Sequence, residues 1–470
     1  MHVCAIVQGL SGERAALAAY VLRTLLGTLG LPHDVAAESP ASVEGKVVVW
    51  YGPSAPPLEG AAVVEIARAD PPEPEAAIRW LEESKQDAVA VEGRRARIGI
   101  DLVAAAALWL TCGDEPDEAR DEHGRIRGAL TPRGKAGLLD RPVVTELMQL
   151  LWRAIDQVAA AGGTPLERRG AWPAGHEFAV LLSHDVDLWR KRTARQLAKE
   201  LLRSATAPGR LGAVARAFCR GPDPWSDLDA IADLEQARGM HSTFFLLPGR
   251  PDRQAGGVRV VGGYGADAGA VEATARRLVA RGWEVGLHGS FDSFRSADAL
   301  AAERQDVEAL AGAPVTGCRQ HFLRFDRLQT WRRQVEAGLR YDASLGYHDV
   351  DGYRCGFSYP FHPFDGEELP LLELPLVVMD GALLERQGLG AEAAWQRVRG
   401  YLERTAADGS LCSLLWHSHY FCELDAPGYR GVYERALDWI RAHRGWGASA
   451  REICEWWRGR TALCAASRAT

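Results

Sequence analysis

The chain has 470 residues and a mass of 51.2 kDa, which is too long for one hydrophobic core, so two or three domains are expected. Hydrophobic residues make up 47% and charged residues 25%, which excludes a disordered or a fibrous chain. A net charge of −7 gives no support for nucleic-acid binding, and we expect no nucleic-acid partner.

Residues 1–165 have the pattern of a small α/β domain without a visible catalytic constellation. Apolar runs predict strands over residues 2–7, 46–50 and 61–67. Apolar spacing, prolines and glycines predict helices over residues 13–29, 74–83 and 140–160. The longest uncharged apolar stretch, residues 102–112, is too short to span a bilayer, and the first residues lack a signal-peptide pattern. We therefore expect a cytoplasmic protein without a transmembrane segment.

The glycines and prolines of residues 161–173 predict a linker, after which strand and helix patterns alternate. Strands are predicted over residues 178–183, 241–247, 283–287, 315–318, 371–378 and 413–416. Helices are predicted over residues 228–238, 271–281 and 299–310. This alternation favours a parallel sheet or a (β/α) barrel over residues 175–465, with its chemistry at the carboxyl ends of the strands.

Residues 190–220 interrupt the alternation with a strongly basic helical insertion. They contain nine lysines and arginines, and Glu200 is the only acidic residue among them. A solvated helix face explains this composition, and so does contact with an anionic glycan or with a lipid carrier at a membrane surface. Peripheral contact with a membrane through this stretch is therefore one of the partners we consider.

Ligand-type residues recur just after the predicted strands. Asp185 and Asp187 lie two residues apart at the end of the first strand, on the same face, which suits one metal ligand and one proton acceptor. His288 follows the third strand. Arg319 and His321 follow the next one, and His417 and His419 follow the last.

Carboxylate and imidazole donors of this kind suit Zn²⁺ or a similar divalent ion with an open position for water. Such an ion lowers the pKa of bound water to about 7 and polarises a carbonyl. A neighbouring Asp then accepts the proton, and a His protonates the leaving group. The residues alone therefore predict metal-assisted hydrolysis of an amide or an ester. The nine single cysteines, without a C-x-x-C pair, indicate neither a disulfide framework nor a zinc ribbon.

The same segments resemble the polysaccharide deacetylase superfamily, the NodB-homology domain of carbohydrate esterases, over residues 175–460. Residues 239–245 (GMHSTFF), 281–288 (RGWEVGLH) and 371–375 (LLELP) are similar to three strands of that family. The motifs SHDVD, GLHGSF, RQHFLRF and WHSHYF resemble a divergent bacterial branch that also carries an N-terminal domain of unknown role. The resemblance implies a distorted (β/α)₇ barrel, preceded here by the smaller α/β domain.

The resemblance also implies a divalent metal, with Zn expected and Co or Ni as alternatives, and the removal of N- or O-acetyl groups from a sugar. By position, Asp185 matches the catalytic base, Arg319 the arginine that orients it, and His417 the catalytic acid. Asp187 and His288 match metal ligands. The substrate implied is an acetylated sugar of a bacterial polysaccharide or of its precursor.

The chain departs from the family pattern at three places. Asp292 stands where the family usually has a second metal histidine, His321 replaces a proline, and His419 is an additional histidine. We expect His321 or Asp292 to complete the metal site, with His419 as a further alternative. We expect Asp342 or Asp365 to orient His417. Side chains expected to contact the substrate are Phe291, Phe322, Arg324 and His419.

Two alternatives remain open from the sequence. One is an amidohydrolase with a substrate that is not a carbohydrate. The other is a glycan-binding or assembly module without catalysis, which the missing second metal histidine would favour.

Overall fold

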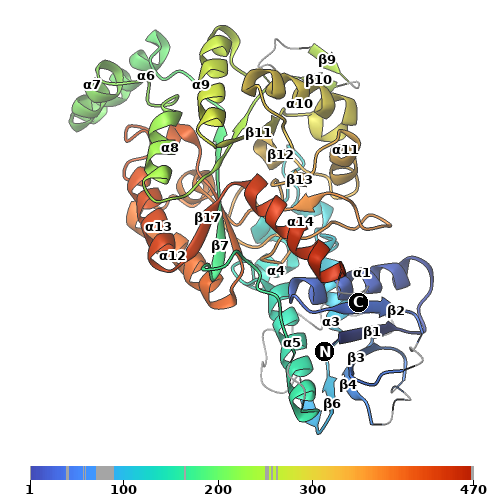
Figure 1. Ribbon diagram of the computed structural model, residues 1–470. Coiled ribbons are helices and arrows are strands. Elements are labelled where there is room, and N and C mark those ends of the chain that lie inside the picture. The colour runs from blue at the N-terminus through green and yellow to red at the C-terminus, as the bar shows by residue number, and fades with distance from the viewer. Residues whose placement is uncertain are drawn as a thin grey trace.

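The computed structural model describes residues 2–38, 42–69 except 55, 57 and 59, 89–163, 166–248, 253–255, 258–260 and 263–466. The helix predicted over residues 74–83 lies outside these ranges. Two sheets organise the described chain, one from residues 2–98 and one from residues 178–448, with helices around each (Figure 1). None of the described helices is long and apolar enough to cross a membrane.

The first sheet has six strands in the order β2-β1-β3-β4-β6-β5, parallel except for the antiparallel pair β5 and β6. Alternation along β1 and β3 sends one set of side chains toward the helices, and it sends Cys4, Ile6, Val48 and Trp50 into a small core on the other face. The strands are β1 (His2–Val7), β2 (His33–Ala36), β3 (Lys46–Tyr51), β4 (Ala62–Ile66), β5 (Val89–Glu92) and β6 (Arg95–Ile98). The helices are α1 (Gly12–Thr28), α3 (Leu102–Leu110), α4 (Pro132–Lys135) and α5 (Val143–Ala161), with short turns at Asp117–Ala119 and Gly128–Leu130.

The second sheet is parallel and follows the order β14-β13-β12-β11-β8-β7-β16-β15, with β17 paired to β7. Its central strand β7 (Phe178–Val186) is buried at every residue and pairs with β16, β8 and β17. The two ends of the sheet, β14 and β15, do not pair with each other, so the curled sheet is not closed by hydrogen bonds. The other strands are β8 (Thr243–Leu246), β11 (Glu284–Gly289), β12 (Gly317–Gln320), β13 (Tyr341–Asp342), β14 (Leu372–Glu373), β15 (Val378–Met379), β16 (Leu411–Leu415) and β17 (Gly445–Ala448).

Helices connect the strands of this sheet, and an antiparallel hairpin, β9 (Arg253–Ala255) and β10 (Val258–Val260), lies between β8 and α9 in the chain. The helix α10 shows how the sequence sets the bounds: Ser296 caps its first turn through Ala299 N, and Gly312 ends it in the left-handed region. The helices are α6 (Ala194–Thr206), α7 (Leu211–Cys219), α8 (Leu228–Gln236), α9 (Ala268–Ala280), α10 (Ala297–Ala311), α11 (Thr330–Glu336), α12 (Ala391–Asp408), α13 (Tyr429–Ala442) and α14 (Ala450–Ala466).

The fold class agrees with the sequence, and one predicted strand is wrong in detail. The strand expected over residues 371–378 is two short strands, β14 and β15, at opposite ends of the sheet. Pro375 lies between them and has no N–H for a ladder, and Leu376 N instead donates to Leu345 O. The single apolar run therefore crosses from one end of the sheet to the other.

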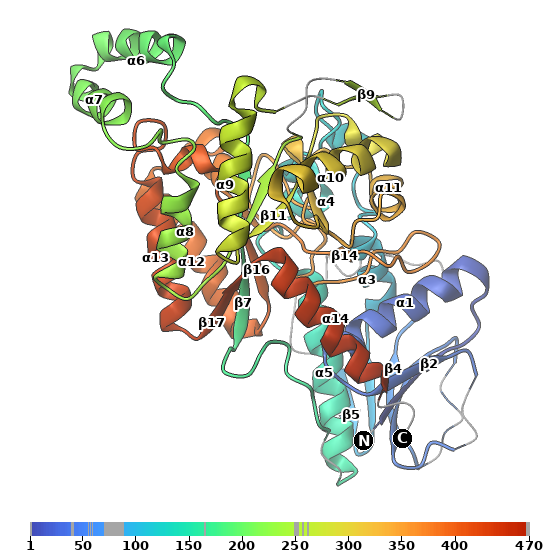
Figure 2. The ribbon, with the colours of Figure 1, turned by 45° about the horizontal axis from the view of Figure 1, so that its top comes forward.

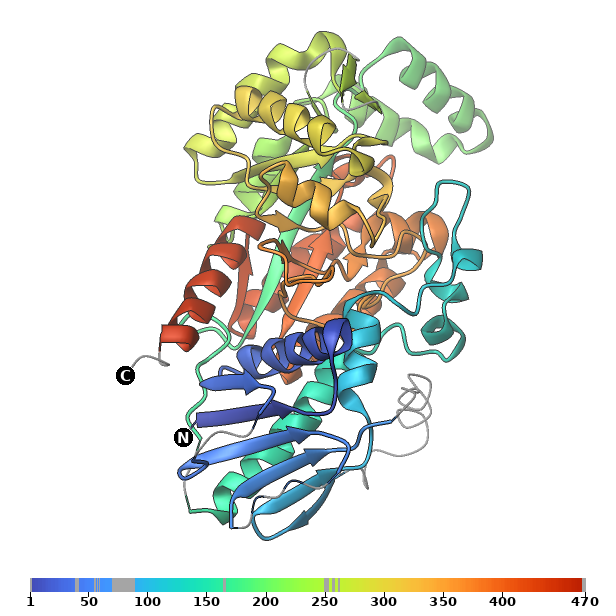
Figure 3. The ribbon, with the colours of Figure 1, turned by 90° about the vertical axis from the view of Figure 1, so that its right-hand side faces the viewer.

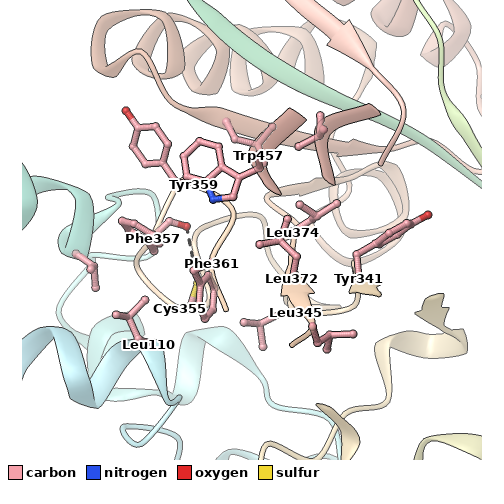
Figure 4. Packing of buried hydrophobic residues seen from close by; sticks show 14 of the residues in the cluster. Leu110, Tyr341, Leu345, Cys355, Phe357, Tyr359, Phe361, Leu372, Leu374 and Trp457 are labelled. Atoms are coloured by element: carbon pink, nitrogen blue, oxygen red, sulfur yellow. Dashed lines mark hydrogen bonds between the residues drawn. The ribbon is translucent and has the colours of Figure 1, made fainter. Parts of the chain in front are cut away.

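The first part of the chain packs directly against the second sheet. Leu110 of α3 lies in one hydrophobic cluster with Trp457 of α14 and with three residues of the loop after β13, Cys355, Phe357 and Tyr359 (Figure 4). Residues 112–142 run from the first sheet along the side of the second (Figure 3). Arg133 Nε donates to Asp114 at 2.8 Å and its Nη1 donates to Tyr353 O at 2.9 Å, with both side chains of the ion pair buried. This contact brings the N-terminal region to the candidate site.

Candidate metal-dependent hydrolytic site

The candidate site lies where β7, β11, β12, β15 and β16 reach their carboxyl ends. Asp185 is the second-to-last residue of β7, and Asp187 directly follows the strand. Because side chains alternate along a strand, His184 points the other way, into the core, where its Nε2 lies 2.8 Å from Glu235 Oε1. The S-H-D-V-D motif therefore gives two carboxylates to the site and a histidine to the core.

Asp187, His288 and His321 form a group that is able to hold a metal ion, the only such group found among the described residues. His288 Nε2 lies 3.1 Å from Asp187 Oδ1 and 2.9 Å from His321 Nδ1, and His321 Nδ1 lies 3.3 Å from Asp187 Oδ1. The sequence predicted that Asp187, His288 and a further ligand would converge, and they do so in the structure.

The donor set fits a divalent cation. His288 Nδ1 lies 2.9 Å from Arg319 O, and since a carbonyl can only accept, the ring donates there and its Nε2 carries the lone pair when the ring is neutral. This lone pair faces Asp187 Oδ1, which is buried without a hydrogen bond in the described part of the chain. Two histidine nitrogens and one carboxylate oxygen thus converge, which is the chemistry of a three-ligand Zn²⁺ site with an open fourth position.

Without a cation, the charges of this group stabilise one another. Burial alone would raise the pKa of Asp187, but the His288 and His321 rings hold it well below its ordinary value. Burial would lower the pKa of His288, but the Asp185 and Asp187 carboxylates raise it. A cation bound at His288 Nε2 would displace the proton that the Asp185 and Asp187 carboxylates favour on that ring, so metal binding and pH are coupled at this group.

Arg319 holds Asp185 in place. Its Nη1 donates to Asp185 Oδ1 at 3.0 Å and to Ser183 Oγ at 2.8 Å, and its Nε donates to Ala343 O at 2.9 Å. The guanidinium is fully buried and lies over the Phe245 ring, 4.5 Å from its centroid. Asp185 Oδ2 lies 3.8 Å from His288 Nε2, so this carboxylate is oriented by Arg319 and adjacent to the metal group.

His417 approaches the group from another side and is paired with Asp380. Its Nδ1 lies 2.6 Å from Asp380 Oδ1, its backbone N donates to Asp380 Oδ2, and its Nε2 lies 3.6 Å from Asp187 Oδ2. Burial would lower the pKa of His417, but the Asp380 carboxylate raises it to about 10. The ring is therefore protonated at neutral pH and is suited to donate a proton.

The prediction that Asp342 or Asp365 orients His417 is wrong. Asp342 instead accepts from Gln334 Nε2 at 2.7 Å and from Ser344 Oγ at 2.6 Å, and Asp365 pairs with Arg332 at 2.7 Å. Asp380 was missed in the sequence, although it directly follows strand β15 as Asp187 directly follows β7. The positional rule that found the other residues would have found this one.

Asp292 does not join the metal group. Its Oδ1 accepts from Arg324 Nη1 at 2.7 Å, because the chain after β11 turns Asp292 toward that arginine. Arg324 also donates to Phe291 O and to His123 O, and its guanidinium covers the Phe291 ring at 3.9 Å. The prediction of Asp292 as a metal ligand is therefore wrong, and so is the prediction of Phe291 and Arg324 as substrate contacts. These three residues hold a loop together and do not line the pocket.

A pocket of about 390 Å³ opens above the metal group. Phe322 and His419, both expected to contact the substrate, are among its lining residues, together with Tyr420 and Met379. Burial and the neighbouring His417 lower the pKa of His419, and its Nδ1 is buried without a hydrogen bond in the described part of the chain. His419 is therefore a neutral ring beside a charged one, available to a polar group of a ligand.

The turn that presents His321 has an unusual backbone. Phe322 and Leu323 have φ values of 61° and 53°, in the left-handed region that residues other than glycine rarely adopt. The turn places His321 in the metal group and leaves the Phe322 ring 45% exposed at the pocket. Such strain persists where the surrounding contacts determine the conformation, and it is concentrated at functional sites.

Two further residues of the pocket wall are not among the site residues predicted from the sequence. Arg125, from the N-terminal region, lines the pocket, forms an ion pair with Asp121 at 2.7 Å and lies over the Phe322 ring. His348, from the loop after β13, also lines it and lies 3.3 Å from Asp121. No local sequence signal places Arg125 there, because the packing of residues 112–142 on the second sheet brings it to the site.

No protein-family model matches the chain, and no curated protein matches it. Similar solved structures include one described as a polysaccharide deacetylase from Mycobacterium smegmatis, at 20% identity and a TM-score of 0.43, covering 62% of this chain and 93% of that chain. One described as a polysaccharide deacetylase from Pseudomonas aeruginosa PAO1 has 17% identity and a TM-score of 0.39, with coverages of 64% and 96%. An allantoinase has 14% identity and a TM-score of 0.41, with coverages of 61% and 92%.

Proposed function

We propose that this protein is a metal-dependent hydrolase that removes acetyl groups from an N- or O-acetylated sugar of a bacterial polysaccharide or its precursor. The observation that carries the proposal is the convergence of Asp187, His288 and His321 between two separately positioned proton-transfer groups. A divalent ion bound by these three residues would lower the pKa of a water molecule and polarise the acyl carbonyl.

The other residues are placed for the proton transfers. Asp185, oriented by Arg319, accepts the proton of the attacking water, and His417, charged through Asp380, donates a proton to the departing amine or alkoxide. The two groups reach the metal group through different ligands, Asp185 toward His288 and His417 toward Asp187. Asp185 is placed as the base by the hydrogen bond from Arg319, and His417 is suited as the acid because Asp380 favours the charged imidazole.

The acetylated sugar is supported by the motif resemblance and by the exposed Phe322 ring in the pocket, which offers a stacking surface for a sugar. The complete acid and base pairs disfavour a module without catalysis, because such a module has no need for a charged His417 beside an oriented Asp185. An amide that is not part of a carbohydrate is the remaining alternative, and the substrate assay distinguishes it.

The test uses the full-length chain. We expect about one Zn²⁺, Co²⁺ or Ni²⁺ per chain by elemental analysis, and acetate release from N-acetylglucosamine oligomers or acetylated xylan that chelation abolishes and Zn²⁺ restores. The Asp187→Ala and His288→Ala variants should lose both metal and activity. Asp292→Ala is the matched control and should keep the metal. Full metal and full activity in Asp187→Ala would overturn the proposal, and activity on small amides alone would favour the alternative substrate.

A further inference from the structure

Residues 190–220 form a helical arm that projects from the body of the molecule. The arm contains α6 and α7, which extend beyond the helices that cover the second sheet (Figures 1 and 2). Its inner side is fixed: Lys191 Nζ lies 3.2 Å from Glu200 Oε1 and 2.7 Å from Asp425 Oδ1, and Val214 packs with Trp225. The orientation of the outer side is therefore set by the fold.

The outer side of the arm is unusually apolar for a basic segment. Leu202 is 75% exposed, Leu211 51% and Leu201 48%. Nine large hydrophobic residues are exposed in the described part of the chain, and these three and Leu188 fall within a stretch of 24 residues, 188–211. Scattered exposed leucines need no explanation, but a concentration of them on one projecting element marks an interaction surface.

Cations surround these leucines. Arg195 and Lys199 precede Leu202 by seven and three residues, which places all three on one face of α6. Arg216 and Arg220 are exposed on and after α7. The structure shows no ion pair for these four cations within the described residues, whereas Glu200, the one acid of the arm, is buried under Lys191, Arg203 and Arg210. The exposed charge of the arm is therefore of one sign.

We propose that the outer side of this arm docks on an anionic membrane surface. Exposed leucines with unpaired lysine and arginine around them are the composition of an interfacial helix, in which the cations meet lipid headgroups and the apolar side chains enter the boundary below. A second copy of this chain is a poorer occupant, because a two-fold contact through the same face would oppose Arg195 and Lys199 to their own copies. The proposal is independent of the reaction that the site performs.

The arm also borders the catalytic pocket. A second depression of about 400 Å³ runs along α6 past Lys199 and Arg203, and it shares Leu188, Glu385, His419 and Tyr420 with the pocket above the metal group. A membrane under the arm would therefore lie beside the mouth of the pocket. Docking would hold the pocket close to any substrate that is anchored in the same surface.

The experiment measures flotation of the full-length protein with lipid vesicles. The protein should float with vesicles of phosphatidylcholine containing 30% phosphatidylglycerol, as a chosen test composition, and not with pure phosphatidylcholine, and about 0.5 M NaCl should weaken the binding. Arg195→Gln with Lys199→Gln should reduce the bound fraction at limiting lipid about tenfold, and Leu202→Ser should reduce it several-fold. All three side chains are exposed, and unfolding curves verify that the variants are folded.

Matched controls carry the same chemical changes elsewhere. Arg94→Gln with Arg97→Gln removes two exposed cations, one just before strand β6 and one in it, and Leu328→Ser removes a leucine that is 62% exposed on a loop. Both controls should bind vesicles as the wild type does. Equal binding to neutral and anionic vesicles, no binding to either, or an equal loss in the controls would overturn the proposal. A dimer in solution that Leu202→Ser dissociates, without vesicle binding, would assign the face to a second copy instead.

Discussion

The Asp380–His417 pair gives the site a proton donor. Asp380 raises the pKa of His417, and this effect arises between these two side chains. Asp380 is fully buried and accepts hydrogen bonds from the backbone N atoms of Gly381 and His417, so its carboxylate is held in one orientation. Its charge is therefore directed at the imidazole. Removing this charge changes the chemistry without changing the shape of the pair.

We predict that Asp380→Asn lowers kcat about 100-fold while metal content stays at the wild-type level, because it removes the charge that keeps His417 protonated. The pKa of His417 falls, so the alkaline limb of the pH–rate profile moves to lower pH. Acetate release measured across pH, together with elemental analysis, checks both effects. Asp365→Asn, at a surface ion pair with Arg332, should leave the profile unchanged. Loss of metal in Asp380→Asn would instead make Asp380 a ligand support.

At the scale of residues, the sequence was sufficient to predict the site residues that lie at the ends of buried strands. Asp185, Asp187, His288, Arg319 and His417 are all in or directly after buried strands, and strand periodicity and position predict that they meet. Asp292 was misplaced because a loop residue has no such rule: its direction depends on a turn and on Arg324. The sequence does not distinguish His321 from Asp292 or His419 as the remaining ligand for the same reason, and the left-handed turn at Phe322 and Leu323 places His321 in the metal group.

At the scale of elements, helix α10 supports the loop that follows the metal histidine. Glu303 on α10 is buried, its Oε2 accepts from Ser290 N at 3.0 Å, and its Oε1 accepts from Ser290 Oγ. Burial raises the pKa of Glu303 from 4.5 to about 7, and the bonds from Ser290 oppose this effect only in part. A carboxyl group under the active site thus changes charge near neutral pH.

A carboxyl group with a higher pKa in the fold than in the unfolded chain binds its proton more tightly in the fold. Its contribution to stability is present below pH 4.5 and is lost as the pH rises to about 7. We predict that the free energy of unfolding of Glu303→Gln, measured relative to that of the wild type, increases by about 2 kcal/mol from pH 5 to pH 8. Urea unfolding at both pH values measures it. Glu272→Gln, exposed on α9, should track the wild type, and a Glu303→Gln difference that is the same at both pH values would contradict the assignment.

Elements were predictable in proportion to their length and regularity. The strands β1, β3, β7 and β11 and the helices α1, α8, α9 and α10 were predicted close to their bounds, because each has a clear period or buried run. The two-residue strands β13 and β15 were not, since two residues carry no period. The arm of α6 and α7 was predicted as basic and helical, but only the structure shows which leucines it exposes.

At the scale of the whole molecule, the N-terminal region forms part of the pocket wall. Arg125 reaches the site on residues 112–142, which are anchored by the buried ion pair of Arg354 with Glu115 at 2.6 Å and by the hydrogen bond from Arg133 Nη1 to Tyr353 O at 2.9 Å. The division of the chain at residues 165–175, predicted from the sequence, stays a prediction. The sequence showed no role for residues 1–165 because the position of Arg125 at the pocket depends on contact with the second sheet.

We predict that Arg125→Ala raises KM about tenfold with kcat nearly unchanged, because the guanidinium lines the pocket but is not one of the proton-transfer groups. Steady-state kinetics on the best substrate of the wild type measure both constants. Arg127→Ala, exposed two residues away, is the control and should behave as the wild type. Since Asp121 loses its partner in Arg125→Ala, thermal unfolding must show that the variant is folded at the assay temperature. A fall in kcat at constant KM would contradict a role in substrate binding.

The pocket wall built from residues 112–142 has a consequence for how such a protein can change in evolution. A gene fragment that began near residue 175 would encode the metal group and both proton-transfer pairs, but it would leave Arg354 and Tyr347 uncovered and the pocket open on one side. Recombination between relatives could therefore exchange the second sheet only together with residues 112–142, which pack against it. The metal group and the other lining residues of the pocket are encoded after residue 175, but Arg125 is encoded before it.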